Sequence, residues 1–130
     1  MEENTFSIIN KVRKPVPING NRFLAFKDKV LGNKYSLSVI FIGIKTSRKL
    51  NRAYRKIDRP TDILSFPIDK KEGEIYINPN VAKKKSMVFD RNYSNYLEFL
   101  FIHGLVHLKG FDHGSRMESE EEKIRKVFNV

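Results

Sequence analysis

The spacing of apolar residues along the chain predicts four short strands. Residues 5–10 form a run rich in β-forming side chains, and residues 35–42 alternate between more and less apolar positions. Residues 62–66 and 74–78 are two further short runs, and Pro67 is expected to close the first of them, because proline cannot donate a ladder hydrogen bond. Together these segments predict a small, mostly mixed sheet of about four strands.

Apolar residues at helical spacing occur between and after these strands. Asn19 is a suitable N-cap for a helix that ends near Leu31, and Thr46 is a suitable N-cap for the next helix. Residues 79–86 predict a short basic helix or turn. Residues 118–128 predict a closing helix whose acidic residues precede its basic ones, as the helix dipole favours.

The segment 94–109 is apolar on nearly all sides, so we expect this helix to be buried in the middle of the fold. Gly110 follows it and can adopt the left-handed conformation that ends a helix. No repeat or linker divides the chain. The order of elements predicts one α+β domain over residues 1–130, with helices packed mainly on one face of the sheet.

Composition narrows the function classes. The chain has 130 residues and no cysteine, which excludes a disulfide scaffold, thiolate metal ligands and a cysteine nucleophile. Its net charge is +10, and the positive excess lies in residues 1–110. Such a field attracts polyanions, of which nucleic acid is the commonest, although a lysine-rich surface can also serve solubility or reflect a biased genome.

The sequence also gives an expectation of where the protein acts. No apolar run reaches the ~18 residues of a membrane span, and the N-terminus lacks the basic-then-apolar order of a signal peptide. We therefore expect a cytoplasmic protein without a membrane partner.

Three histidines, all that the chain contains, fall within the segment HGLVHLKGFDH. His103 and His107 are four residues apart on the buried helix, so both rings project from one face. Gly110 ends the helix and lets the chain bring His113 back toward that face. Three neutral imidazoles predict an open site for one Zn²⁺, or another divalent transition metal, with water completing the coordination. The alternative is two core histidines and an unrelated one in a turn.

Two other interpretations of the histidines stay open. A structural zinc would need a fourth protein ligand, which without cysteine would be Asp112 or Glu118. The spacing also matches a class of zinc peptidases, but these carry a glutamate directly after the first histidine, and Gly104 occupies that position here. The metal is therefore expected to act mainly as a Lewis acid that activates water.

Three segments carry a resemblance to a known family. HGLVHLKGFDH resembles the His-Gly-x-x-His-Leu-x-Gly-Tyr-Asp-His signature of the YbeY endoribonucleases. Residues 50–67, LNRAYRKIDRPTDILSFP, resemble a second block of that family, and GEIYIN at 73–78 is similar to the strand that follows it. Two positions depart from the family pattern: Phe111 replaces a tyrosine, and Glu74 replaces an aspartate.

The resemblance implies a single α+β domain with a three-histidine zinc site that cleaves single-stranded RNA. It further implies a role in maturing the 3′ end of 16S rRNA of the small ribosomal subunit, and in ribosome quality control. Carried over by residue, His103, His107 and His113 are metal ligands, and Arg55 is the functional arginine. Asp62 and Ser65 belong to the motif beside the site, and Asp112 belongs to the metal loop.

Phosphodiester cleavage builds negative charge, which a metal and the planar fork of Arg55 can stabilise. We therefore expect Arg55, His103 and His107 to be catalytic, with Asp112 either bonded to a ligand histidine or capping the turn. Single-stranded RNA and the small ribosomal subunit are the expected partners, and DNA is not. Basic residues could follow the RNA backbone: Lys83, Lys84, Lys85, Arg48, Arg52 and Arg59.

Two alternative functions remain at this point. One is a non-catalytic ribosome-assembly factor whose metal is structural. The other is a zinc hydrolase of small molecules or peptides, against which Gly104 and the net charge both weigh.

Overall fold

The protein is described from a computed structural model that covers residues 5–130. Residues 1–4, on which the signal-peptide expectation partly rests, lie outside this range. The elements follow in the order β1 (Phe6–Asn10), α1 (Gly20–Leu31), β2 (Ser36–Phe41), α2 (Ile44–Arg55), β3 (Ile63–Asp69), β4 (Glu72–Ile77), α3 (Pro79–Val88), α4 (Tyr93–Leu108) and α5 (Ser115–Phe128).

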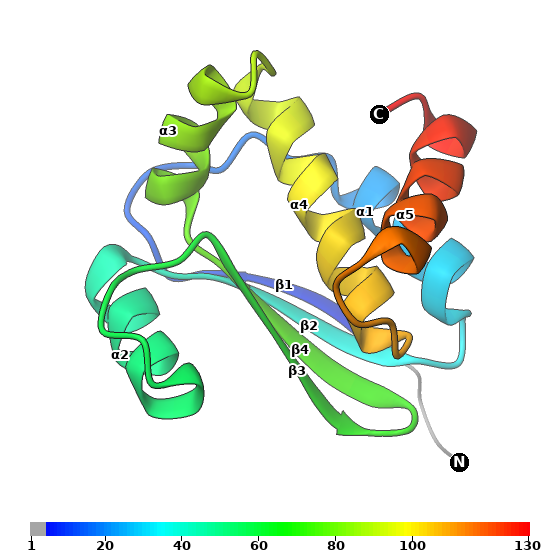
Figure 1. Ribbon diagram of the computed structural model, residues 1–130, viewed down its shortest axis with the longest axis horizontal. Coiled ribbons are helices and arrows are strands. Elements are labelled where there is room, and N and C mark those ends of the chain that lie inside the picture. Colours follow the sequence, from blue (N-terminus) through cyan, green and yellow to red (C-terminus); the bar gives the residue numbers. More distant parts are fainter. Residues whose placement is uncertain (1–4) are drawn as a thin grey trace.

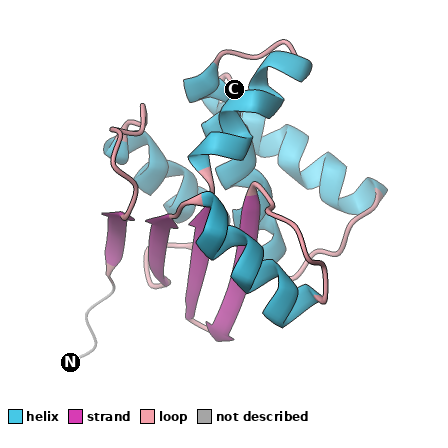
Figure 2. Ribbon diagram, turned by 90° about the vertical axis from the view of Figure 1, so that its left-hand side faces the viewer, coloured by secondary structure: helices cyan, strands magenta, loops and turns pink. Residues whose placement is uncertain are grey.

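The four strands form one mixed sheet, as predicted, and Figure 2 shows them side by side. Their order is β1-β2-β4-β3. β1, β2 and β4 run parallel, and β3 pairs antiparallel with β4 through a tight connection. The carboxyl ends of β1, β2 and β4 therefore meet at one edge of the sheet. The residues that follow these strands, including Gly43 and Pro79, begin the loops and helices at that edge.

Most helices cover one face of the sheet, as predicted. Figure 1 shows α1, α3, α4 and α5 together above the sheet and α2 apart from them. On β3, Ser65 donates a hydrogen bond to the Gly104 carbonyl of α4 (3.3 Å), while the ring of Phe66 lies 4.8 Å from that of Tyr54 on α2. Because successive strand residues point to opposite faces, α4 and α2 pack on opposite faces of the sheet.

The α4 helix is the central buried helix that the sequence predicts. Leu97, Phe101 and Leu105 are fully buried, and the Phe101 ring stacks on Phe23 of α1 at 4.3 Å. The helix also lies very close to the sheet. A Cβ at Gly104 would be 2.8 Å from Ile63 Cδ1, so any other residue would force the Ile63 side chain to shift.

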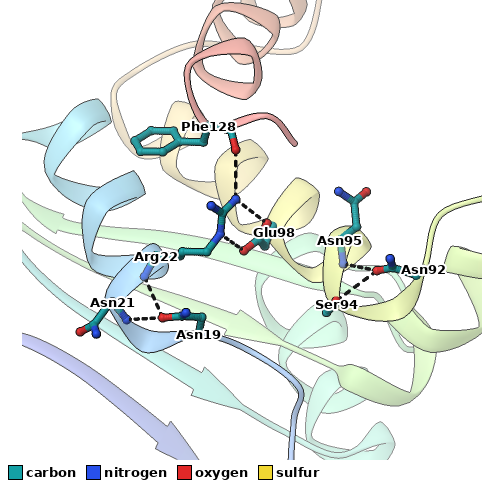
Figure 3. A network of polar contacts seen from close by, with 8 residues as sticks. All are labelled: Asn19, Asn21, Arg22, Asn92, Ser94, Asn95, Glu98 and Phe128. Atoms are coloured by element: carbon teal, nitrogen blue, oxygen red, sulfur yellow. Dashed lines mark hydrogen bonds and ion pairs between the residues drawn. The ribbon is translucent and has the colours of Figure 1, made fainter.

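A polar network fixes the helix layer around α4 (Figure 3). Arg22 of α1 donates two hydrogen bonds to the Glu98 carboxylate of α4, at 2.7 and 3.0 Å, and a third to the Phe128 carbonyl of α5 at 3.1 Å. A bidentate, charge-assisted pair is directional, so it sets the angle between α1 and α4. Asn19 caps α1 through the Asn21 and Arg22 amides, which confirms its predicted role.

Three predicted boundaries are wrong. α2 begins at Ile44 with Gly43 as its N-cap, not at Thr46. β3 continues past Pro67 to Asp69, because β3 is an edge strand, where a missing N–H costs no ladder bond, and its register shifts at that point. α5 begins at Ser115, one turn before the predicted start at Glu118. None of the helices within residues 5–130 has the length and apolar character to cross a membrane.

Candidate metal centre

The three histidines come together at the end of α4. His103 and His107 lie one turn apart on that helix, and His113 lies in the loop before α5. One ring nitrogen from each lies within 4.8 Å of the other two, and the Nε2 atoms of His107 and His113 are 3.0 Å apart. The structure therefore contradicts the alternative in which two core histidines and a turn histidine are unrelated.

Gly110 makes this convergence possible. Its φ is 112°, a left-handed conformation that a residue with a side chain rarely adopts. Its N–H donates to the His107 carbonyl at 3.0 Å, which ends α4 and reverses the chain. The predicted helix stop is confirmed, and the reversal brings His113 back to the face that carries His103 and His107.

The donor set fits a transition-metal ion. Ligand nitrogens on a tetrahedral Zn²⁺ lie ~2.0–2.1 Å from the ion and about 3.3 Å from one another, so small ring rotations would bring these nitrogens to that spacing. Among residues 5–130, neither Asp112 nor Glu118 adds a carboxylate to the cluster. The protein can thus supply three ligands and leave one position open, which is the arrangement of catalytic rather than structural zinc.

Glu121 of α5 is a site residue that the sequence analysis missed. Its carboxylate oxygen lies 3.0 Å from Nδ1 of His103, and the residue is only 5% exposed. A carboxylate at Nδ1 holds the proton there and leaves Nε2 free to bind a metal. The signal was present in the sequence, because Glu121 shares a helical stripe with the buried Met117 and Ile124.

Of the two roles expected for Asp112, the bond to a ligand histidine is not found. Within the part of the chain that the structure describes, no hydrogen bond joins Asp112 to a histidine, and the side chain is exposed. The orienting carboxylate comes from Glu121 instead.

The environment of His107 favours its neutral form. Burial lowers the pKa of His107, and the electrostatic influence of the neighbouring His103, His113 and Arg55 lowers it further, while an interaction with the Phe111 backbone raises it. Metal binding requires a neutral imidazole. His107 is therefore ready to act as a ligand at neutral pH without first losing a proton.

Arg55 and Ser65 lie beside the histidines, as predicted. Together with His107 and Asp112 they line a cavity of about 260 Å³. Arg55 is exposed at the last residue of α2, where its charge also suits the negative end of the helix dipole. The cavity thus joins a guanidinium to the histidine cluster across a space that an anion can enter.

Asp62 is placed away from the site, contrary to expectation. Its carboxylate accepts hydrogen bonds from Lys85 of α3 (3.1 Å) and from the Tyr96 hydroxyl of α4 (3.4 Å). Tyr96 lies seven residues before His103, which is about 10 Å along the helix. Asp62 therefore ties the start of β3 to α3 and α4 rather than contributing to the metal centre.

Two of the basic residues expected along an RNA path are already paired with carboxylates. Lys85 pairs with Asp62, and Arg48 forms a two-point pair with Asp58 at 2.8 and 3.2 Å. Their charges are partly neutralised, so they are poorer phosphate ligands than Arg55.

The fold and the cluster together define an α+β protein with an open three-histidine site suited to a metal ion. Comparison with known proteins identifies the family. The model of the YbeY family, described as endoribonuclease YbeY, matches residues 18–129. The chain belongs to this family, and it is an endoribonuclease, a hydrolase that acts on RNA.

Relatives named endoribonuclease YbeY match most of the chain. The protein of Campylobacter jejuni strain 81-176 is 33% identical over 83% of this chain and 86% of its own. That of Mycoplasmopsis synoviae is 41% identical over 72% of this chain and 68% of its own. The solution structure of TM1509 from Thermotoga maritima has a TM-score of 0.64 at 24% identity, covers 96% of this chain and 90% of its own, and shares its fold.

Proposed function

We propose that the protein is a zinc-dependent endoribonuclease that cleaves single-stranded RNA. In this proposal His103, His107 and His113 hold one Zn²⁺, and Arg55 contacts the scissile phosphate. The observation that carries it is the meeting of three ring nitrogens within 4.8 Å, beside a cavity that His107 shares with Arg55. The family signature over residues 103–113 supports the same ligand set.

The proposed chemistry needs positive charge more than a carboxylate base. Zinc held by the three histidines, with its fourth coordination position open, would supply Lewis acidity and a bound water of lowered pKa. The Arg55 guanidinium presents parallel N–H donors that match two phosphate oxygens, so it binds the phosphodiester and stabilises the charge that develops on it. Ser65 lines the same cavity and contributes a small polar wall beside His107.

The rest of the chain holds these groups in place. Glu121 orients the ring of His103 through its contact with Nδ1. Arg55 ends α2, and two buried polar residues of that helix bind the segment that leads into β3. Ser47 exchanges two hydrogen bonds with Thr61 (2.8 and 2.9 Å), and Asn51 donates to the Arg59 carbonyl at 2.9 Å.

We further propose that the substrate is the precursor of small-subunit rRNA, cleaved near its 3′ end in the cytoplasm as part of ribosome maturation and quality control. The resemblance of residues 50–78 and 103–113 to the family supports this role, and the net charge of +10 suits a large polyanionic substrate.

The test measures metal content and RNA cleavage on the same purified samples. We expect wild-type protein to bind one zinc per chain and to cleave a single-stranded RNA. His107→Ala should lose both properties, and Arg55→Ala should keep the metal and lose cleavage. Lys49→Ala removes an exposed positive charge from the same helix and should change neither. Metal-independent cleavage, or full activity in Arg55→Ala, would refute the proposed roles.

A further inference from the structure

A second cavity lies at the opposite end of α4 from the histidines. It has a volume of about 450 Å³ and lies at the carboxyl ends of the parallel strands β1 and β2. The loop after β1 forms one wall and the first turns of α3 form another, and the two run side by side in Figure 1. We call this space the strand-end pocket.

The pocket lies at a switch point of the sheet. The chain leaves β1 toward α1 on the α4 face, whereas it leaves the neighbouring β2 toward α2 on the opposite face (Figure 1). Two adjacent parallel strands whose connections diverge leave a crevice between their carboxyl ends, and ligands of α/β sheets bind in such crevices. The volume is within the range that holds a small ligand.

The positive charge of the pocket indicates the kind of ligand that it binds. Four basic residues line it, and none of its lining residues within 5–130 is acidic; the four are Lys11, Arg13, Lys14 and Lys83. None of the four forms an ion pair in the part of the chain that the structure describes. Unpaired positive charges that converge on a hollow favour an anion, and they repel one another until an anion binds.

The backbone adds to this preference. Gly43 lines the pocket and is the N-cap of α2, and it offers no side chain to cap the first N–H groups of that helix. The first turn of α2 contains no acidic residue. The positive end of the α2 dipole thus adds to the four basic side chains.

The loop that carries three of these charges is held in a fixed shape. The Asn10 side chain accepts a hydrogen bond from the Val12 amide (2.8 Å) and donates one to the Lys14 carbonyl (3.3 Å). The Lys11 amide donates to Phe41 of β2 at 2.9 Å. Binding would therefore not need to order the loop, which removes a major entropic cost.

One wall of the pocket is aromatic. Tyr93 is the first residue of α4 and is half-buried, and the Lys83 ammonium lies 5.9 Å from its ring centre. A flat ring beside a cluster of cations suits a ligand that has both an aromatic base and a phosphate. Tyr93 and His107 are fourteen residues apart on α4, which corresponds to about 21 Å. The pocket is therefore separate from the metal centre.

We propose that the strand-end pocket binds the phosphate of a nucleotide, with Arg13 and Lys83 as its main side-chain ligands and Tyr93 beside the base. The nucleotide is either free or part of an RNA strand, since both carry the same phosphate and base.

The test is a titration of the full-length protein, followed by NMR at the Val12 and Gly43 amides. Adenosine 5′-monophosphate should shift both amides saturably, whereas adenosine, which lacks the phosphate, should not. Arg13→Ala/Lys83→Ala should weaken binding about tenfold or more. Lys29→Ala/Lys123→Ala removes two exposed charges elsewhere and should leave binding unchanged.

The source of the phosphate is resolved by a second arm with a single-stranded oligonucleotide. Shifts with both ligands mean that the pocket accepts free nucleotides, and shifts with the oligonucleotide alone mean that it holds a phosphate of the substrate strand. The proposal is wrong if neither ligand moves the two amides, or if the double variant binds like wild type. His107→Ala should titrate normally, so failure of this proposal is distinguishable from failure of the metal centre.

Discussion

Removing the carboxylate of Glu121 should weaken metal binding although Glu121 does not reach the metal position. Glu121 is 5% exposed and lies 3.0 Å from Nδ1 of His103, so it makes a buried, charge-assisted hydrogen bond. Such bonds contribute about 1.5–3 kcal/mol. At 1.36 kcal/mol per decade this corresponds to a loss of ~10–100-fold in zinc affinity for Glu121→Ala. Loss of an orienting partner of a metal ligand typically has an effect of that size.

The assay is a zinc titration against a competing chelator, for wild type and two Glu121 variants. Glu121→Gln keeps an oxygen that accepts the Nδ1–H bond but loses the charge, so its affinity should fall between those of wild type and Glu121→Ala. Glu122→Ala is the matched control, because Glu122 is exposed and pairs with Lys126 one turn further along α5. The reasoning is refuted if folded Glu121→Ala binds zinc as tightly as Glu122→Ala does.

Three further predictions concern the site and its support. Arg55→Ala should lower RNA cleavage by ~10²-fold or more at unchanged zinc content, measured as single-turnover cleavage beside metal analysis. Gly104→Ala should lower the free energy of unfolding, measured in urea, by about 1–3 kcal/mol, because its Cβ would lie 2.8 Å from Ile63 Cδ1. Gly20→Ala is the control: its nearest contact would be 3.8 Å away, so the free energy of unfolding should not fall. The pKa of His107 is lowered in the folded state. As pH falls, the His107 side chain is therefore protonated in the unfolded chain before it is protonated in the folded protein. The metal-free protein should therefore lose stability as pH drops below about 6.5, and His107→Ala should reduce that slope, as urea unfolding over a pH series would show.

The metal centre was predictable because its determinants are local in sequence. A four-residue spacing on a helix fixes the relation of His103 to His107, and Gly110 fixes the direction in which the chain returns to His113. No contact between distant elements is needed for this part of the site. The buried helix was equally predictable, since a segment that is apolar on nearly all sides must be covered on all sides.

The parts that sequence reasoning missed depend on how distant elements pack. Glu121 contacts His103 because α5 lies against α4, and Asp62 instead bonds Lys85 of α3 and Tyr96 of α4. Pro67 was taken as the end of a strand, but a proline is tolerated where the strand has a neighbour on one side only. Strand order is not encoded locally, so an edge strand could not be recognised in advance.

Arg55 is an intermediate case. Its position in a sequence block that resembles the family suggested a role. Its residue type and spacing alone do not distinguish it from an ordinary surface arginine at the end of an exposed helix. Its place in one cavity with His107 depends on how α2 packs beside β3 and the end of α4, which are distant in sequence.

The tight packing of Gly104 also limits what this histidine arrangement can become. In zinc peptidases with the same spacing, the residue after the first histidine is a glutamate that serves as general base. Here a Cβ at that position would lie 2.8 Å from Ile63 Cδ1, 3.0 Å from Ser65 Oγ and 3.1 Å from Ile75 Cδ1. A glutamate there would therefore require these side chains of the sheet, or α4 itself, to move. The close contact between α4 and the sheet thus disfavours the glutamate that zinc peptidases use as their general base.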